Sequence, residues 1–167
     1  MTERALAPWW RPDIHAKASR HRAVRGAVLG ATRAHFAAAG FTEVETPVLQ
    51  TSPGLEPHLQ AFATEIVAPD RAARRCLYLH TSPEFAMKKL LVAGERRIFQ
   101  LCKVFRNAER AATHHPEFTM LEWYRAEANY ESVMDDCVAL LRAALGAARR
   151  ERFSWQGVES DPFGDWR

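Results

Sequence analysis

The pattern of apolar and polar positions predicts a long helix early in the chain and a short strand after it. From about Asp13 to Ala39 apolar side chains recur at roughly helical spacing, and Gly40 follows as a natural stop. The next residues, "FTEVETPVL", are rich in strand formers, but Pro47 cannot donate to a ladder. We therefore expect an edge strand or a strand end there.

Two further helices are predicted by apolar spacing and by end signals. In "TSPEFAMKKLLVAG", Ser82 can cap the helix, Pro83 suits its first turn and Gly94 ends it. "ESVMDDCVALLRAALGAARR" carries apolar side chains four residues apart on one face, and Ser132 with Asp135 resembles a capping box. The final segment, "FSWQGVESDPFGDWR", has little periodicity, so no element is predicted in it.

Four stretches have the composition of strands. "LQAFATEIVAP" and "RCLYLHT" predict two strands joined by a polar turn around Asp70. "RRIFQLCKVFRN" and "EFTMLEWYRAE" predict an antiparallel pair, connected by a polar loop from about Ala108 to His115. Helices and antiparallel strands thus come in blocks, and no internal repeat is visible, which predicts an α+β domain.

Side chains of the last predicted strand alternate between two faces. One face carries Phe118, Met120, Glu122 and Tyr124, and the other carries Thr119, Leu121, Trp123 and Arg125. Leu121 and Trp123 make a plausible core face. The opposite face is aromatic and acidic, which suits an ammonium ligand. The same pattern also fits a half-buried polar strand face that binds nothing.

The composition is that of a soluble globular protein, with 47% hydrophobic and 26% charged residues. A net charge of +3 permits an anionic ligand, but it fits a solvated arginine-rich surface equally well. Cys76, Cys102 and Cys137 form no CxxC pair, so we expect buried thiols in a reducing compartment and no disulfide framework. No signal peptide or membrane-spanning stretch is visible, which predicts a cytoplasmic protein.

The segment "VFRNAERAATHHPEFTMLEWY" concentrates the reactive side chains. His114 and His115 are adjacent and would point apart in an extended segment, so we predict no metal site. Arg106, Arg110 and His114 could instead surround a polyphosphate, with Phe118 as a stacking face for a base. Arginines on a loop are usually just solvated, so these residues alone leave the choice open.

This segment resembles motif 2 of the class II aminoacyl-tRNA synthetases in its lysyl-type form, which reads roughly F-R-N-E, a variable loop, then H-N-P-E-F-T-x-x-E-x-Y. The first helix with "GFTEVETPVL" resembles motif 1 of that class, and "TSPE" at 81–84 resembles its lysyl-type substrate loop. On this basis residues 1–167 resemble the N-terminal part of a class II synthetase-like catalytic domain, with motif 1 at about 22–50 and motif 2 at about 98–127. The implied fold is an antiparallel sheet flanked by helices.

Within that class the chain is most similar to the elongation factor P lysine ligase family, through "HLQAF", "IFQLCKVFRN" and "PEFTMLEWYR". This resemblance implies that lysine or (R)-β-lysine is activated with ATP and Mg²⁺ and then transferred to a lysine of elongation factor P. It also implies a homodimer formed through motif 1. No anticodon-binding domain, tRNA partner or membrane is expected.

The resemblance assigns nucleotide contacts to motif 2. Arg106 would hold the α-phosphate and offset the charge that develops on phosphorus, which makes it the implied catalytic residue. Asn107 belongs to the same nucleotide-binding set. His114 would lie near the terminal phosphates, Phe118 would stack on adenine, and backbone groups near His115 would read the adenine edge. Activation in this class works by positioning and electrostatics, so no general base is required.

The resemblance also assigns the amino-acid site. Glu84, Glu122 and Tyr124 would bind amino groups of the lysyl substrate. Ser82 and Pro83 belong to the substrate loop that carries Glu84.

Two positions depart from the family pattern. Ala108 stands where a glutamate is expected, and His115 stands where asparagine is usual. We also expect the chain to be truncated before motif 3, because that glycine-rich motif and the acidic stretch that supplies Mg²⁺ ligands are not found. The chain then resembles the N-terminal half of the enzyme, weak or inactive alone. The alternatives are a non-catalytic module that binds nucleotide or amino acid or dimerises, and a fragment of a lysyl-tRNA synthetase.

Overall fold

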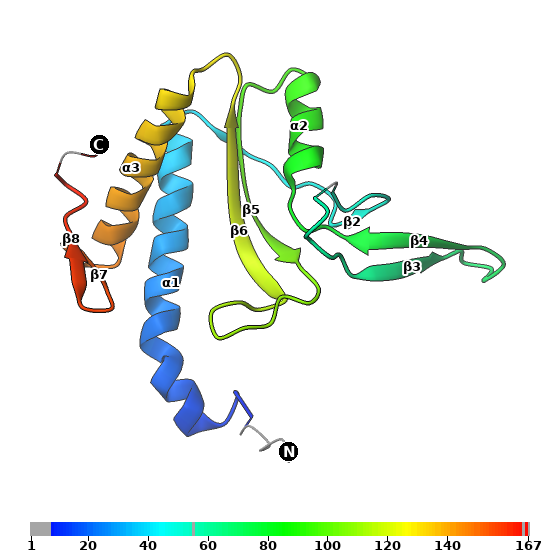
Figure 1. Cartoon of the computed structure of the whole chain (residues 1–167), viewed down its shortest axis with the longest axis horizontal. Helices are drawn as coiled ribbons and strands as arrows, with labels where there is room; N and C mark the ends of the chain where they lie inside the picture. The colour runs from blue at the N-terminus through cyan, green and yellow to red at the C-terminus, as the bar shows by residue number, and fades with distance from the viewer. Residues whose placement is uncertain (1–7, 55, 165, 167) are drawn as a thin grey trace. The chain divides into compact units, whose positions relative to one another are not determined.

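The computed structural model describes residues 8–54, 56–164 and 166. They form two compact units (Figure 1). The first contains the described residues up to Ala38 and those from Asn129 onward, and the second runs from Ala39 to Ala128. Helices and mostly antiparallel strands confirm the predicted α+β class.

Two helices make up most of the first unit. α1 (Pro12–Ala38) and α3 (Tyr130–Ala147) pack against each other and lie side by side in Figure 1. Phe36 of α1 and Leu145 of α3 are buried. The predicted stop of α1 is confirmed, since Gly40 has a φ of 74°, in the left-handed region that glycine adopts without strain.

A β-hairpin follows α3 in the segment where the sequence predicted no element. Its strands are β7 (Phe153–Trp155) and β8 (Val158–Ser160). Gln156 and Gly157 between them both have positive φ, as the two-residue turns of tight hairpins require. The two strands are too short to show a periodic pattern in the sequence. The turn residues Gln156 and Gly157 were the sequence feature that could have indicated the hairpin.

The start of α3 corrects the predicted capping box. The N-cap residue is Asn129, whose Oδ1 accepts a hydrogen bond from the Ser132 N–H at 3.1 Å. Ser132 therefore lies inside the helix, and its hydroxyl donates to the same oxygen at 2.7 Å. The Ser132–Asp135 box was wrong because Asn129, an equally good capping residue, comes first along the chain.

The second unit contains two three-stranded sheets. One has the order β1-β5-β6, with β1 (Thr42–Glu43), β5 (Arg97–Phe105) and β6 (Glu117–Arg125). β5 and β6 are antiparallel from Arg97 opposite Arg125 to Phe105 opposite Glu117, which confirms the predicted pair. β1 runs parallel to β5 at the edge of this sheet, so the sheet is not wholly antiparallel.

The other sheet has the order β2-β4-β3, with β2 (Leu49–Gln50), β3 (Ala63–Val67) and β4 (Arg74–Leu79). β3 and β4 are the two strands predicted around Asp70. β1 and β2 are both edge strands, and Pro47 lies between them, so the segment predicted as one strand is divided in two. The predicted burial of all cysteines is wrong at Cys76 in β4, which is exposed.

His80 connects the two sheets just before the predicted substrate loop. Its backbone N–H donates to the Val48 carbonyl at 3.0 Å, and its carbonyl accepts from the Phe105 N–H at 3.0 Å. Its buried ring places Nε2 2.7 Å from the Lys103 carbonyl oxygen. The chain that leaves β4 is thereby held beside the end of β5, which places residues 81–83 next to the β5–β6 pair.

The buried side chains of β5 lie on both faces of its sheet. Ile98, Gln100 and Val104 share the face of their β6 partners Tyr124, Glu122 and Phe118, and all three are buried. Phe99 is buried on the other face. The side chains of Leu121 and Trp123, predicted as core, are only half-buried. The face predicted to be aromatic and acidic is therefore also core, because β5 supplies it with buried partners.

The cap of α3 gives a stability prediction. Asn129→Ala removes the acceptor of the Ser132 N–H, so the free energy of unfolding should fall by about 1 kcal/mol, as for other N-cap residues. Ser132→Ala removes only a hydroxyl that donates to Asn129, so its effect should be smaller. Urea unfolding followed by circular dichroism measures both, and a larger loss for Ser132→Ala would favour the capping box instead.

Candidate functional site

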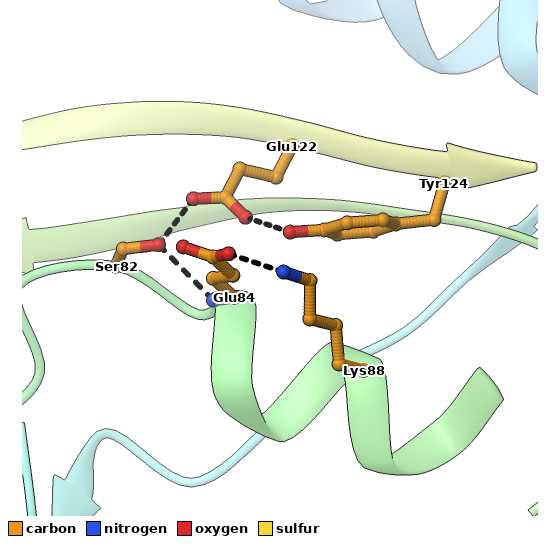
Figure 2. Close-up of polar contacts among 5 residues, drawn as sticks. All are labelled: Ser82, Glu84, Lys88, Glu122 and Tyr124. Carbon is orange, nitrogen blue, oxygen red and sulfur yellow. Dashed lines mark hydrogen bonds and ion pairs between the residues drawn. The ribbon is translucent and has the colours of Figure 1, made fainter. Parts of the chain in front are cut away.

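Four of the predicted residues meet where α2 (Glu84–Val92) begins (Figure 2). The Ser82 hydroxyl donates to Oε1 of Glu122 and accepts from the backbone N–H of Glu84 at 3.0 Å. The Tyr124 hydroxyl donates to Oε2 of Glu122 at 3.0 Å. Both carboxylate oxygens of Glu122 are therefore held by neutral hydroxyl groups, and Ser82 joins the start of a helix to a strand.

Local structure explains why these side chains converge. Glu122 and Tyr124 are two residues apart on β6, so they point to the same face of the sheet. The first N–H groups of a helix lack partners within it, and Ser82 supplies an acceptor for that of Glu84. The assigned N-cap is Pro83, which has no side-chain cap, so Ser82 acts one residue earlier than a standard cap.

The environment of the cluster keeps the Tyr124 phenol protonated. Burial raises the pKa of Tyr124, and the negative charge of Glu122, the hydrogen bond to that carboxylate and the charge of Glu84 raise it further. Burial also raises the pKa of the Cys102 thiol to about 11, with the Glu122 charge adding to it and a hydrogen bond from Gln100 opposing it. Tyr124 and Cys102 are both half-buried beside the Glu122 carboxylate, and such a position favours a cationic ligand over an anionic one.

Lys88 is a member of this cluster to which the sequence reading gave no role. Its Nζ lies 2.5 Å from Oε1 of Glu84, four residues earlier in α2. Side chains at this spacing meet on one face of a helix, so the Glu-to-Lys interval was the signal that could have identified the pair. Glu84 thus already holds an ammonium group.

Arg106 and Phe118 form a second contact beside the first. The Arg106 guanidinium lies over the Phe118 ring at 5.3 Å from its centroid, and its Nε donates to the Thr81 carbonyl at 3.3 Å. Thr81 directly precedes Ser82 in the chain, so the residue that Arg106 contacts is adjacent to a member of the carboxylate cluster. One face of the Phe118 ring is occupied by Arg106, and a base stacking on the ring would have to use the other face.

The remaining predicted nucleotide residues stay in or near the loop between β5 and β6. The side-chain oxygen of Asn107 accepts from the Ala108 N–H at 2.9 Å, within the loop itself. His114 Nδ1 lies 3.1 Å from the Thr113 hydroxyl, and His115 Nδ1 lies 3.3 Å from the Glu117 N–H. The side-chain hydrogen bonds of Asn107, His114 and His115 are all local, and none of them reaches Arg106 or Phe118.

The arrangement offers two chemically distinct halves. Glu84 and Glu122, with the Tyr124 hydroxyl, suit an ammonium group, and Arg106 suits a phosphate or carboxylate.

Among the residues that the structure describes, no three His, Cys, Asp or Glu side chains gather so that they could hold a metal ion. In the same part of the chain, none of the helices combines the length and apolarity needed to cross a membrane.

Residues 11–157 match the family model described as tRNA synthetases class II (D, K and N). The chain belongs to this family. The match covers most of the chain, and it includes both the Ser82–Glu122–Tyr124 cluster and the Arg106–Phe118 contact. The family resemblance read from the motifs is therefore confirmed.

Curated relatives support a narrower likeness. The elongation factor P--(R)-beta-lysine ligase of Photobacterium profundum is 43% identical over 147 residues, covering 88% of this chain and 45% of that protein. The ligase of the same name from Pseudoalteromonas translucida is 44% identical over 147 residues, covering 88% and 44%. That from Vibrio vulnificus is 42% identical over 147 residues, covering 88% and 45%. The chain thus spans a little under half the length of these relatives.

The shifted pKa of Tyr124 gives a prediction for alkaline pH. Because the folded-state pKa is raised, this residue contributes stability that is fully present below the ordinary tyrosine pKa of about 10 and is lost as pH rises through the folded value. Above about pH 10, the free energy of unfolding should therefore fall more steeply with pH in the wild type than in Tyr124→Phe. Urea unfolding at a series of pH values measures this difference.

The same titration can be followed directly by NMR of tyrosine labelled with ¹³C at the ζ carbon. Glu122→Gln should lower the pKa of Tyr124 only in part, because burial is the largest cause of the shift and remains. A Tyr124 resonance that titrates at or below the ordinary tyrosine value would contradict the geometry of the cluster.

Proposed function

We propose that this chain contributes the lysine and ATP contacts of an enzyme that activates lysine or (R)-β-lysine and transfers it to a lysine of elongation factor P. The observation that carries the proposal is the pairing of two sites. The Ser82–Glu122–Tyr124 cluster suits ammonium groups, and Arg106, bonded to the carbonyl of the residue before Ser82, suits an anion. A lysine-type amino acid has ammonium groups and a carboxylate, and activation joins that carboxylate to a phosphate.

In the proposed reaction the substrate carboxylate attacks the α-phosphorus of ATP. A C–O–P linkage forms, the bond from the α-phosphorus to the bridging oxygen breaks, and pyrophosphate leaves. The ε-amine of the acceptor lysine then attacks the acyl carbon, an amide bond forms, AMP leaves and the amine loses a proton. Arg106 would offset the charge that develops on phosphorus, while Glu84 and Glu122 hold the substrate in place.

Different observations support the substrate, the acceptor and the nucleotide in this proposal. The name of the relatives, elongation factor P--(R)-beta-lysine ligase, supports elongation factor P as the acceptor and (R)-β-lysine as the substrate. Family membership supports ATP with Mg²⁺, and the adenine ring would have to stack on the face of Phe118 that Arg106 does not cover. The proposal assigns no Mg²⁺ ligand among the described residues.

Ala108 bears on how well the nucleotide binds. Its φ is 62°, a left-handed conformation that a non-glycine residue adopts only at some cost. The family pattern places a glutamate at this position, and alanine has no carboxylate to replace it. We expect ATP to bind weakly for this reason.

Two substitutions should separate the amino-acid contacts from the nucleotide contacts. Glu122→Gln removes the charge of the carboxylate that Ser82 and Tyr124 hold, so lysine affinity should fall at least ten-fold while ATP affinity changes little, since a charged hydrogen bond is worth about 1.5–3 kcal/mol. Arg106→Ala should do the reverse for ATP. Isothermal titration calorimetry with lysine, (R)-β-lysine and ATP measures both.

Matched controls come from exposed ion pairs of the second unit. Glu65→Gln removes a carboxylate paired with Arg74, and Arg96→Ala removes an arginine paired with Glu127, all with exposed side chains. Neither control should change binding. Equal losses in the Glu122 variant and its control, or lysine binding unaffected by Glu122→Gln, would refute the assignment of the amino-acid site.

A non-catalytic binding module is the second candidate, and Ala108 in place of the family glutamate favours it. Such a module would bind lysine or nucleotide, or form a homodimer through the motif 1 region, without chemistry. ATP–pyrophosphate exchange with lysine or (R)-β-lysine distinguishes the two functions, because binding without exchange would leave only the module. Sedimentation velocity would test the proposed homodimer independently of either function.

A further inference from the structure

Lys88 brings a positive charge to the carboxylates of the cluster. Its Nζ lies 2.5 Å from Oε1 of Glu84, and Figure 2 shows its side chain reaching from the next turn of α2 to that carboxylate. Glu122, in contrast, accepts hydrogen bonds from the neutral hydroxyls of Ser82 and Tyr124. Of the two carboxylates, Glu84 is thus the one whose charge is already matched by an ammonium group.

The Lys88–Glu84 pair is placed so that another ammonium can replace it. The side chains are 53% and 35% exposed, so water reaches the pair and screens it. Pairs of this spacing on exposed helices are weak, and releasing one leaves a long lysine side chain free to extend into solvent. The pair can therefore exchange partners easily while still occupying Glu84 in the absence of ligand.

We propose that Lys88 is an internal competitor for the substrate: it pairs with Glu84 in the absence of ligand and is displaced by an ammonium group of the substrate. This inference rests on the proposed function for the identity of that substrate, an amino acid with a second amino group. Binding is then an exchange of one ammonium for another at Glu84. Lys88 lowers the affinity for every ammonium ligand, so a substrate gains from Glu84 only if its own ammonium fits better than that of Lys88.

Lys88→Met tests the exchange because methionine keeps much of the chain length and removes the charge. Ligand affinity at Glu84 should rise about two-fold, the worth of an exposed ion pair at this spacing. Lys89→Met is the matched control, since Lys89 is also an exposed lysine of α2 but points about 100° away around the helix. The control should bind as the wild type does.

The measurement follows the Glu84 carboxyl carbon by NMR in protein labelled with ¹³C-glutamate, with the resonance assigned by Glu84→Gln. Two ligands are titrated, L-lysine and n-butylammonium, which is an ammonium probe without a carboxylate. We expect tighter binding of both to Lys88→Met, and a smaller gain at high salt because the pair is solvent-exposed. Unchanged or weaker n-butylammonium binding would overturn the inference and show that Lys88 supports Glu84 instead of competing for it.

The two ligands separate this inference from the proposed function. If n-butylammonium binds more tightly to Lys88→Met while neither lysine nor ATP binds any form, the exchange at Glu84 stands and the proposed function falls. If lysine and ATP bind the wild type but the Lys88 variant shows no gain for either ammonium ligand, the proposed function stands and the exchange falls.

Discussion

The hydroxyl of Ser82 is the group on which the candidate site depends. It accepts from the first N–H of α2 and donates to Glu122 on β6, so a single side chain connects a helix start to a strand. A hydroxyl can do both because it carries one donor and two acceptor lone pairs. Glu84 and Glu122 belong to separate elements, α2 and β6. The Ser82 hydroxyl bonds to both elements, and Tyr124 donates to the same Glu122 carboxylate.

The backbone around His80 makes that connection possible. Hydrogen bonds from its N–H, its carbonyl and its ring hold the end of β4 against Val48, Lys103 and Phe105, and residues 81–83 follow immediately. The predicted substrate loop therefore starts from a fixed position at the junction of two sheets. Arg106 adds a further bond to the carbonyl of Thr81, the residue before Ser82, so the same short segment contacts both Arg106 and Glu122.

The site also shows how a half-buried polar cluster is kept satisfied. Glu122 would be costly to desolvate alone, but two hydroxyls donate to it and the Tyr124 phenol remains protonated because its pKa is raised. Glu84 is more exposed and is matched by Lys88. The two carboxylates are thus stabilised in different ways, one by neutral donors and one by an exchangeable cation, and they should respond differently to an incoming ammonium group.

The sequence by itself determined the helices, the β5–β6 pair, the shared face of Phe118, Glu122 and Tyr124, and the family, because these depend on periodicity and on motifs that are local in the chain. It misplaced the α3 cap and missed the β7–β8 hairpin, where one good capping residue competes with another or the strands are too short for a pattern. Only the tertiary structure decided that Ser82 reaches Glu122, that Arg106 covers one face of Phe118, and that the aromatic and acidic face of the sheet is also core. Those features join residues far apart in the chain, and no local pattern records which distant side chain a donor will find.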